Sequence, residues 1–260
     1  MNDSRPAPLA LICSVPLEAE PLQTLLLERE PFAVGRRSAV SGRLEGREVI
    51  VISGGMGKTN AAQALTALLE SREIAGVVGF GVGGAYPGSG LEPGDVAIAT
   101  SEIYGDEGVA APQGWLTTRE IGIPLLDQGD LRHFNEFPIA PPRLAAAFGA
   151  LRAAGIVSIA GTFVTVSCCS GTAARGEELA RRFDAVCESM EGAAYAHVAA
   201  LYGLPFLELR GISNLVEDRD LSRWRLRDAA RAAANAIAVL ARVRDGADFV
   251  GPDPSEGIIE

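Results

Sequence analysis

Long apolar runs and excess positive charge are both missing from this sequence of 260 residues. No apolar stretch approaches the roughly 20 residues that a helix needs to cross a bilayer. Acidic residues outnumber basic ones, 33 Asp and Glu against 23 Lys and Arg, which gives a net charge of -10. Such a chain repels nucleic-acid phosphates and anionic membrane surfaces. We therefore expect no membrane-spanning helix, no nucleic-acid partner and no membrane partner.

The sequence also has few histidines and no pair of cysteines at the spacing of a metal site. The chain has two histidines, and none of its four cysteines has the Cys-x-x-Cys spacing of a zinc site, so we expect no metal site. The cysteines are Cys13, Cys168, Cys169 and Cys187. Four cysteines in a chain of this length favour buried, small apolar side chains of a protein in the reducing cytoplasm. The apolar run from Leu9 to Val15 lacks the basic leader and cleavage site of a signal peptide, which also favours a cytoplasmic protein.

Length and composition favour one α/β domain with a core from about residue 9 to 242. Nearly all-apolar runs alternate with helical patterns, which is typical of a sheet covered by helices on both faces. Strands are predicted at 9–15, 47–53, 74–80, 95–100, within 156–167, and at 205–211. Helices are predicted at 17–28, 59–70, 177–183, 192–202 and 226–242. The segment 102–142 is predicted to be irregular, and the acidic tail at 245–260 to pack loosely.

The segment 54–59, GGMGKT, ends like a phosphate-binding P-loop. Ile52 occupies the position of the first glycine that this motif needs, and no acidic strand partner for magnesium follows. The pattern therefore favours a ligand-lining turn between a strand and a helix, with a P-loop nucleotide-binding protein as the alternative.

Glycines in the segment 79–85, GFGVGGA, allow the backbone to approach a ligand closely. Gly84 stands one position too early for the dinucleotide-binding pattern, so the segment alone indicates little. Met190 and Glu191 precede an Ala-rich helix. The Glu191 carboxylate either stabilises that helix N-terminus or accepts hydrogen bonds from ligand hydroxyls.

Two further segments follow predicted strands. RGISN at 210–214 stands at the C-terminal end of an apolar strand, where open α/β sheets bind their ligands. Its Asn214 amide offers a donor and an acceptor to a heterocycle, or else caps the next helix. Glu18 and Glu20 follow the first strand, where a solvated acidic turn is the alternative to a functional site.

In this order, the segments resemble the nucleoside phosphorylase and nucleosidase superfamily from about Leu9 to Arg242. The most specific matches are MEGAA at 190–194 and GISN at 211–214. Within the superfamily the chain is most similar to futalosine hydrolases, nucleosidases of the alternative menaquinone pathway, and then to methylthioadenosine/S-adenosylhomocysteine nucleosidases. The resemblance implies a three-layer α/β/α sandwich with a central mixed sheet.

The resemblance also implies roles for individual residues. Glu191 matches the carboxylate that binds the ribose hydroxyls, and Asn214 would lie at the purine edge near N7. Glu20 matches the acid that activates the hydrolytic water, with Glu18 as a less favoured substitute. The base wall would form around the two adjacent cysteines, with Phe163 or a neighbour nearby. The implied substrate-binding residues are Gly55, Met56, Gly57, Val82, Gly83, Cys168, Cys169, Met190 and Ser213.

Two departures from relatives predict the reaction. Adenine-cleaving nucleosidases have an aspartate where this chain has Asn214, and an amide donor favours a 6-oxopurine over adenine. Phosphorylases usually have an arginine in the first loop and a serine where this chain has Val82, so water is favoured over phosphate. We therefore expect cofactor-free hydrolysis of a 6-oxopurine nucleoside such as futalosine, with a purine nucleoside phosphorylase or a methylthioadenosine nucleosidase as alternatives.

The 5′ side of the nucleoside is less defined by the sequence. The segment 102–137 is expected to shape the pocket for the 5′ substituent. Arg132 and His133 either contact a carboxylated aromatic tail there or, as the favoured alternative, are solvated loop residues. Relatives are dimers or larger, so the resemblance implies a homo-oligomer.

Overall fold

The computed structural model describes residues 6–129 and 131–243, so the predicted tail at 245–260 lies outside the described residues. The strands are β1 (Leu9–Cys13), β2 (Leu27–Val34), β3 (Arg37–Leu44), β4 (Arg47–Ser53), β5 (Gly76–Ala85), β6 (Val96–Tyr104), β7 (Gly108–Ala111), β8 (Gly114–Thr117), β9 (Leu126–Gln128), β10 (Leu131–His133), β11 (Glu136–Pro138), β12 (Ser158–Thr165), β13 (Ala185–Ser189) and β14 (Phe206–Leu215). The helices are α1 (Pro16–Thr24), α2 (Lys58–Ser71), α3 (Pro141–Ala153), α4 (Ala173–Phe183), α5 (Gly192–Leu201) and α6 (Leu226–Ala241), with a short 3-10 turn at Leu221–Arg223.

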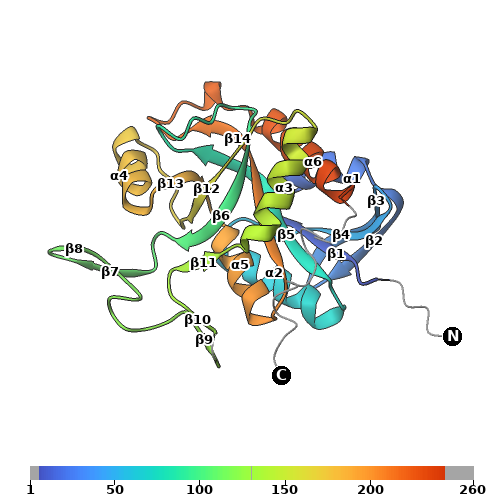
Figure 1. The fold of residues 1–260 in the computed structure, drawn as a ribbon, viewed down its shortest axis with the longest axis horizontal. Helices are drawn as coiled ribbons and strands as arrows, with labels where there is room; N and C mark the ends of the chain where they lie inside the picture. Colours follow the sequence, from blue (N-terminus) through green and yellow to red (C-terminus); the bar gives the residue numbers. More distant parts are fainter. Residues whose placement is uncertain (1–5, 130, 244–260) are drawn as a thin grey trace.

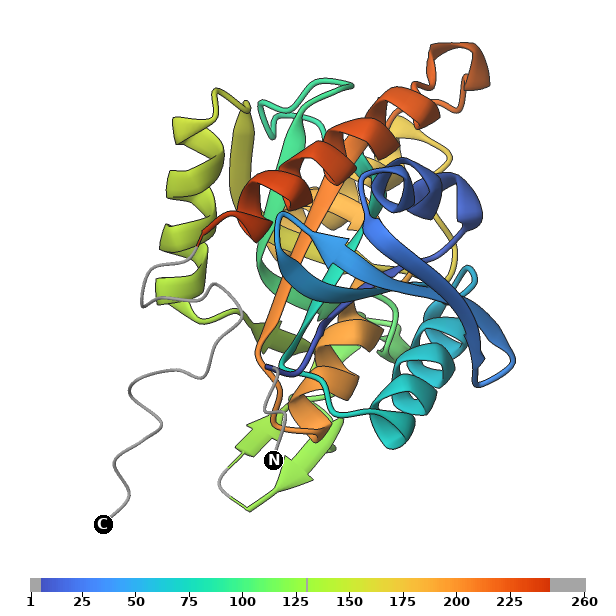
Figure 2. The same cartoon turned by 90° about the vertical axis from the view of Figure 1, so that its right-hand side faces the viewer.

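A ten-stranded mixed sheet forms the centre of the fold, in the order β11-β6-β12-β13-β5-β1-β4-β3-β2, with β14 paired to both β5 and β6. Helices α1, α3 and α6 cover one face of this sheet, and α2 and α5 cover the other (Figures 1 and 2). The arrangement confirms the predicted α/β fold with a central mixed sheet.

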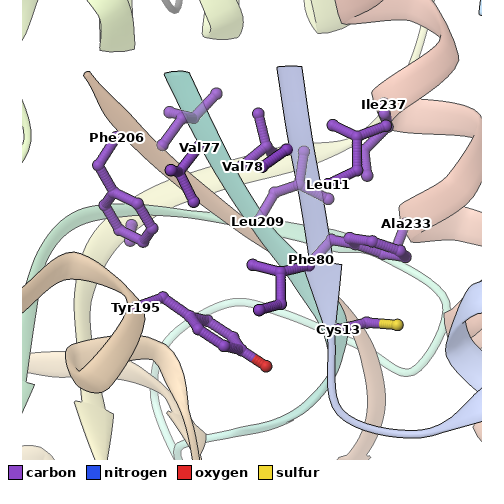
Figure 3. Close-up of a cluster of buried hydrophobic side chains, with 14 of the residues drawn as sticks. Leu11, Cys13, Val77, Val78, Phe80, Tyr195, Phe206, Leu209, Ala233 and Ile237 are labelled. Atoms are coloured by element: carbon purple, nitrogen blue, oxygen red, sulfur yellow. The ribbon is translucent and has the colours of Figure 1, made fainter. Parts of the chain in front are cut away.

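The core lies where β1, β5 and β14 run side by side. Their buried side chains are packed between Ala233 and Ile237 of α6 and Tyr195 of α5, as Figure 3 shows. Helix α6 presents alanine, isoleucine and leucine at helical spacing, so that one continuous stripe of it is buried. This packing holds the parallel strands β1, β5 and β14 in register, so that their carboxyl ends meet at one edge.

Several predicted elements match the structure closely, and others were missed. β4 spans the residues predicted for it, and α2 and α6 differ from their predictions by a residue at each end or less. The helix predicted at 17–28 ends early, at Thr24, and the chain continues as β2. The strands β2, β3 and β13 and the helix α3 were not predicted.

The expectation of an irregular segment at 102–142 is wrong. Its first residues belong to β6, β7 and β8 form one two-stranded sheet, β9 and β10 form another, and β11 joins the edge of the main sheet at β6. Figure 1 shows these small sheets extending away from the helices and the main sheet. Short hairpins of this kind carry too few residues for a periodic sequence signal.

Among the described residues, none of the helices combines the length and the apolar character that crossing a membrane requires.

Candidate active site

A cavity of about 450 Å³ lies where the turn after β1 meets the ends of β5, β13 and β14. Parallel strands place their carboxyl ends at one sheet edge, which is where ligands of α/β proteins bind. The lining residues are Ser14, Val15, Glu18, Met56, Val82, Gly83, Gly84, Cys169, Ser170, Glu188, Ser189, Met190, Glu191, Ser213, Asn214, Val216, Arg219 and Trp224.

Glu18 is the third residue of α1, and the residue is 2% exposed. Its Oε2 accepts hydrogen bonds from the Ser14 amide at 2.9 Å, the Ser14 hydroxyl at 2.7 Å and the Val15 amide at 3.1 Å. Its Oε1 accepts one from the Val82 amide of β5 at 2.8 Å. Oε1 therefore accepts fewer hydrogen bonds than Oε2 and keeps a lone pair for a ligand in the cavity.

Close packing around Glu18 explains one glycine of the 79–85 segment. A Cβ atom at Gly81 would lie 2.4 Å from Glu18 Oε1, and the backbone of Gly81 has a φ of +153°. Any larger residue would therefore push the Glu18 carboxylate away from β5.

Glu191 is the residue that precedes α5, and its carboxylate is almost as deeply buried as that of Glu18. Its Oε1 accepts a hydrogen bond from the Gly57 amide at 2.9 Å, and its Oε2 lies 3.4 Å from Nη1 of Arg210. Burial raises the pKa of Glu191, and the Arg210 guanidinium and the Gly57 amide partly oppose that increase. The turn at GGMGKT thus serves to hold a carboxylate.

Arg210 is 1% exposed and lies between buried carboxyl groups. Its Nε donates to Glu208 Oε1 at 2.7 Å and its Nη1 to the Val82 carbonyl at 3.2 Å. Burial would lower the pKa of Arg210, but Glu208 and Glu191 raise it overall, so the guanidinium stays charged. Burial and the neighbouring Glu208 raise the pKa of Glu102 well above its ordinary value, so Glu102 can hold a proton beside Glu208.

Asn214 lies on β14 at the other end of the cavity and is partly exposed. Its Oδ1 accepts a hydrogen bond from the Ser213 hydroxyl at 2.7 Å, which orients the amide. Its Nδ2 donates one hydrogen to the Leu215 carbonyl at 2.9 Å. The amide nitrogen carries two hydrogens, so the second remains for a ligand.

The structure brings most of the predicted site residues together. Besides Glu191 and Asn214, the cavity is lined by Met56, Val82, Gly83, Cys169, Met190 and Ser213. Gly55 and Gly57 flank Met56 in the turn before α2, and Gly57 acts through its amide rather than as a lining residue.

Glu20, Cys168 and Phe163 lie elsewhere. Glu20 is exposed and lines a different cavity, of about 370 Å³, between α1 and α6, so its expected place in the site is corrected in favour of Glu18. Cys168 is exposed outside the cavity lining, and Phe163 is fully buried in the core.

The segment expected to enclose the 5′ substituent does not line this cavity. No lining residue comes from the described part of 102–137. Arg132 is exposed and pairs with Asp127, and His133 stacks on Phe137, their ring centroids 4.9 Å apart.

Lys58, the lysine of the P-loop alternative, has other partners. Its Nζ lies 2.6 Å from Asp106 Oδ1 and 2.7 Å from Glu107 Oε1. The two carboxylates beside Lys58 repel a phosphate group and so disfavour phosphate binding at this lysine.

Several residues that line the cavity were not predicted from the sequence, the most important being Glu188. Arg210, which is buried beside Glu191, was not predicted as part of the site either. Arg210 was quoted as the start of the RGISN motif but not as part of the site, although a charge inside an apolar strand is a usable signal. Glu188 stands in a strand that was not predicted at all. Within 6–129 and 131–243, no cluster of three or more His, Cys, Asp or Glu residues could hold a metal ion.

Comparisons with known proteins agree with this geometry. A family model described as the phosphorylase superfamily matches residues 8–243. Futalosine hydrolase from Thermus thermophilus is 35% identical over 232 residues, which cover 87% of this chain and 94% of that protein. The 5′-methylthioadenosine/S-adenosylhomocysteine nucleosidase of Neisseria meningitidis, solved in complex with methylthio-immucillin-A, has a TM-score of 0.79 at 24% identity over 91% of this chain and 99% of its own. The futalosine hydrolase structure from Helicobacter pylori has a TM-score of 0.78 at 20% identity, covering 91% and 98% of the two chains. This chain belongs to the phosphorylase superfamily.

Proposed function

We propose that this protein is a nucleosidase that hydrolyses the N-glycosidic bond of a 6-oxopurine nucleoside, with futalosine as the substrate and hypoxanthine as the released base. The observation that carries the proposal is the buried Glu18 carboxylate in the same cavity as Glu191 and Asn214. The relative from Thermus thermophilus, which aligns over most of this chain, bears the name futalosine hydrolase.

Charge in the cavity favours water over phosphate as the nucleophile. Glu18, Glu188 and Glu191 all line it, and carboxylates repel a phosphate ion. The buried guanidinium of Arg210 is already paired with Glu208 and Glu191. Arg219 also lines the cavity, but it is exposed and lies over the Trp224 ring near Asn214, 4.7 Å from the ring centroid.

The reaction places positive charge on the sugar and negative charge on the leaving base. Glu191 accepts hydrogen bonds from the ribose hydroxyls and stabilises the sugar cation, with Met190 packed beneath the ring. Glu18, through the free lone pair of Oε1, takes a proton from the attacking water. The second hydrogen of Asn214 Nδ2 bonds to N7 and stabilises the departing base. No metal or organic cofactor takes part.

The remaining expectations belong to the same proposal. The chain acts as one nucleosidase domain, assembles as a dimer or larger homo-oligomer, and works in the cytoplasm. The free state of all four cysteines agrees with that compartment.

The experiment that tests the proposal is base release from three substrates: futalosine, inosine and methylthioadenosine. We expect hypoxanthine from futalosine at the highest kcat/KM. Preferred release of adenine from methylthioadenosine would instead identify a methylthioadenosine nucleosidase.

A further inference from the structure

We propose that Glu188 is a specificity-determining residue that accepts a hydrogen bond from N1–H of the purine base. The inference rests on the proposed function and extends it, because it explains how the cavity distinguishes a 6-oxopurine from adenine at a second position besides Asn214.

The sheet register places Glu188 and Asn214 on either side of one glycine. Glu188 of β13 pairs with Gly84 of β5, and Gly84 also pairs with Asn214 of β14. Directly paired residues of neighbouring strands project from the same face of a sheet. A Cβ atom at Gly84 would lie 3.5 Å from Asn214 Nδ2, which confirms that face for the amide.

Two strand spacings separate the backbones of Glu188 and Asn214, about 9.5 Å. The Val216 side chain lies over Gly84, where its Cγ2 would be 2.9 Å from a Cβ atom, so Val216 forms an apolar floor in the cavity that it lines together with the two polar side chains. In the proposed arrangement a flat heterocycle lies against Val216, with one edge facing the amide and the adjoining edge facing the carboxylate.

The hydrogen bonds around Glu188 leave one acceptor position without a donor from the described residues. The carboxylate is 5% exposed and receives three donors: the Ser170 amide at 2.8 Å on Oε1, and on Oε2 the Ser170 hydroxyl at 2.6 Å and the Tyr86 hydroxyl at 3.1 Å. Three donors fit an ionised carboxylate, which only accepts. Among the described residues one donor reaches Oε1, so that atom keeps a lone pair.

The donors of Ser170 are thereby occupied, since Glu188 accepts from both its amide and its hydroxyl. Ser170 therefore has no hydrogen-bond donor left for a ligand atom that needs to accept a hydrogen bond. In hypoxanthine N1 carries a hydrogen, which an acceptor binds. In adenine N1 carries a lone pair, which a carboxylate repels. Glu188 thus favours hypoxanthine and opposes adenine.

The test compares Glu188→Gln with wild type on futalosine and on its 6-amino counterpart, and measures binding of free hypoxanthine and adenine by calorimetry. The two hydroxyls of Ser170 and Tyr86 will keep the amide oxygen at the Oε2 position, so the NH2 group takes the Oε1 position, loses the hydrogen bond from the Ser170 amide and faces the base as a donor. We expect the preference for the 6-oxo form, in kcat/KM and in base binding, to fall about 10- to 100-fold. Thermal unfolding will establish that the variant is folded.

Glu217→Gln is the matched control, because Glu217 pairs with Arg223 beside the same end of the cavity but does not line it. Its preference should equal that of wild type. Glu188→Asp shortens the side chain by one methylene and moves the charge away from the base, so it should weaken hypoxanthine binding without improving adenine binding. This variant replaces Glu188→Gln in the test if Glu188→Gln does not fold.

If Glu188→Gln weakens activity and binding equally for the 6-oxo and 6-amino forms, so that the preference is unchanged, Glu188 does not have the proposed role. Release of hypoxanthine by the wild-type protein would in that case still support the proposed function. If wild type released no base, the proposed function would fail, and the two binding constants would still decide whether Glu188 distinguishes hypoxanthine from adenine.

Discussion

The two ends of the cavity are built differently. At the sugar end, Glu18 and Glu191 are held by backbone amides from distant parts of the chain, those of Val82 and Gly57, and Arg210 lies beside Glu191. At the base end, Asn214 is oriented by the hydroxyl of its neighbour Ser213, and Glu188 by the amide and hydroxyl of Ser170 and the hydroxyl of Tyr86. In the proposed mechanism the buried carboxylates at the sugar end serve bond cleavage, whereas the polar side chains at the base end serve recognition. Variants at the sugar end should therefore lower turnover on every substrate, and variants at the base end should change the choice of substrate.

The largest effect is expected at Glu191. Glu191→Gln keeps the shape but loses the charge that stabilises the sugar cation, so kcat on futalosine should fall about 10³-fold. The measurement is steady-state kinetics, with a thermal unfolding curve to show that the fold is intact. Near-normal turnover would remove Glu191 from the mechanism.

A slightly smaller loss is expected at Glu18, and it comes with a matched control two residues away. Glu18→Gln should lower kcat about 10²-fold while changing KM little, since the proposed role is to deprotonate water. Glu20→Gln changes an exposed carboxylate outside the cavity and should leave both constants near wild type. The opposite order of effects would return the water-activating role to Glu20.

At the base end, Asn214→Asp should change selectivity more than turnover. When ionised, the new carboxylate would face N7 and the 6-oxo oxygen, both acceptors; when protonated, it would tolerate an exocyclic amine. A mismatched hydrogen bond costs about 1 to 3 kcal/mol, which is about one to two decades in the ratio of kcat/KM for futalosine and its 6-amino counterpart. If that ratio stays constant, Asn214 does not read the base.

The smallest effect is a shift in pH dependence. Burial raises the pKa of Glu191, with Arg210 partly opposing, so the acid limb of kcat/KM should lie above 4.5, the ordinary glutamate value. In the proposed mechanism the ionised form of Glu191 is the active one, and this form is lost as pH falls through the raised pKa. The folded protein binds this proton more readily than the unfolded chain, so the Glu191 contribution to stability rises over the same window. Activity and melting temperature measured between pH 4.5 and neutrality should show that activity is lost without unfolding; an acid limb at or below 4.5 would contradict the account.

The position of Glu20 outside the cavity has a simple geometric origin. Successive helical residues are rotated by about 100°, so residues two apart lie on nearly opposite faces. α1 begins at Pro16, which turns Glu18 towards the amides of its own first turn and Glu20 towards solvent. The order of the motifs predicts that an acidic turn follows β1. Which glutamate of that turn faces the cavity depends on the residue at which α1 begins, and the sequence defines that residue only to within one or two positions.

The missed elements have equally local reasons. Pro141 and Pro142 suggest a break in the chain, yet proline is favourable in the first turn of a helix, where α3 has it. The five-residue strand β13 contains Glu188, whose burial depends on donors from Ser170 and Tyr86, far away in sequence. Long apolar strands and Ala-rich helices were predictable because burial on one or both faces leaves a periodic pattern.

Phosphate dependence is the most direct measurement of the central claim, that carboxylates at the sugar end direct water rather than phosphate to the nucleoside. Wild-type protein should release hypoxanthine from futalosine in phosphate-free buffer, and added phosphate should change neither the rate nor the sugar product. Release that requires phosphate and yields a sugar 1-phosphate would contradict the account.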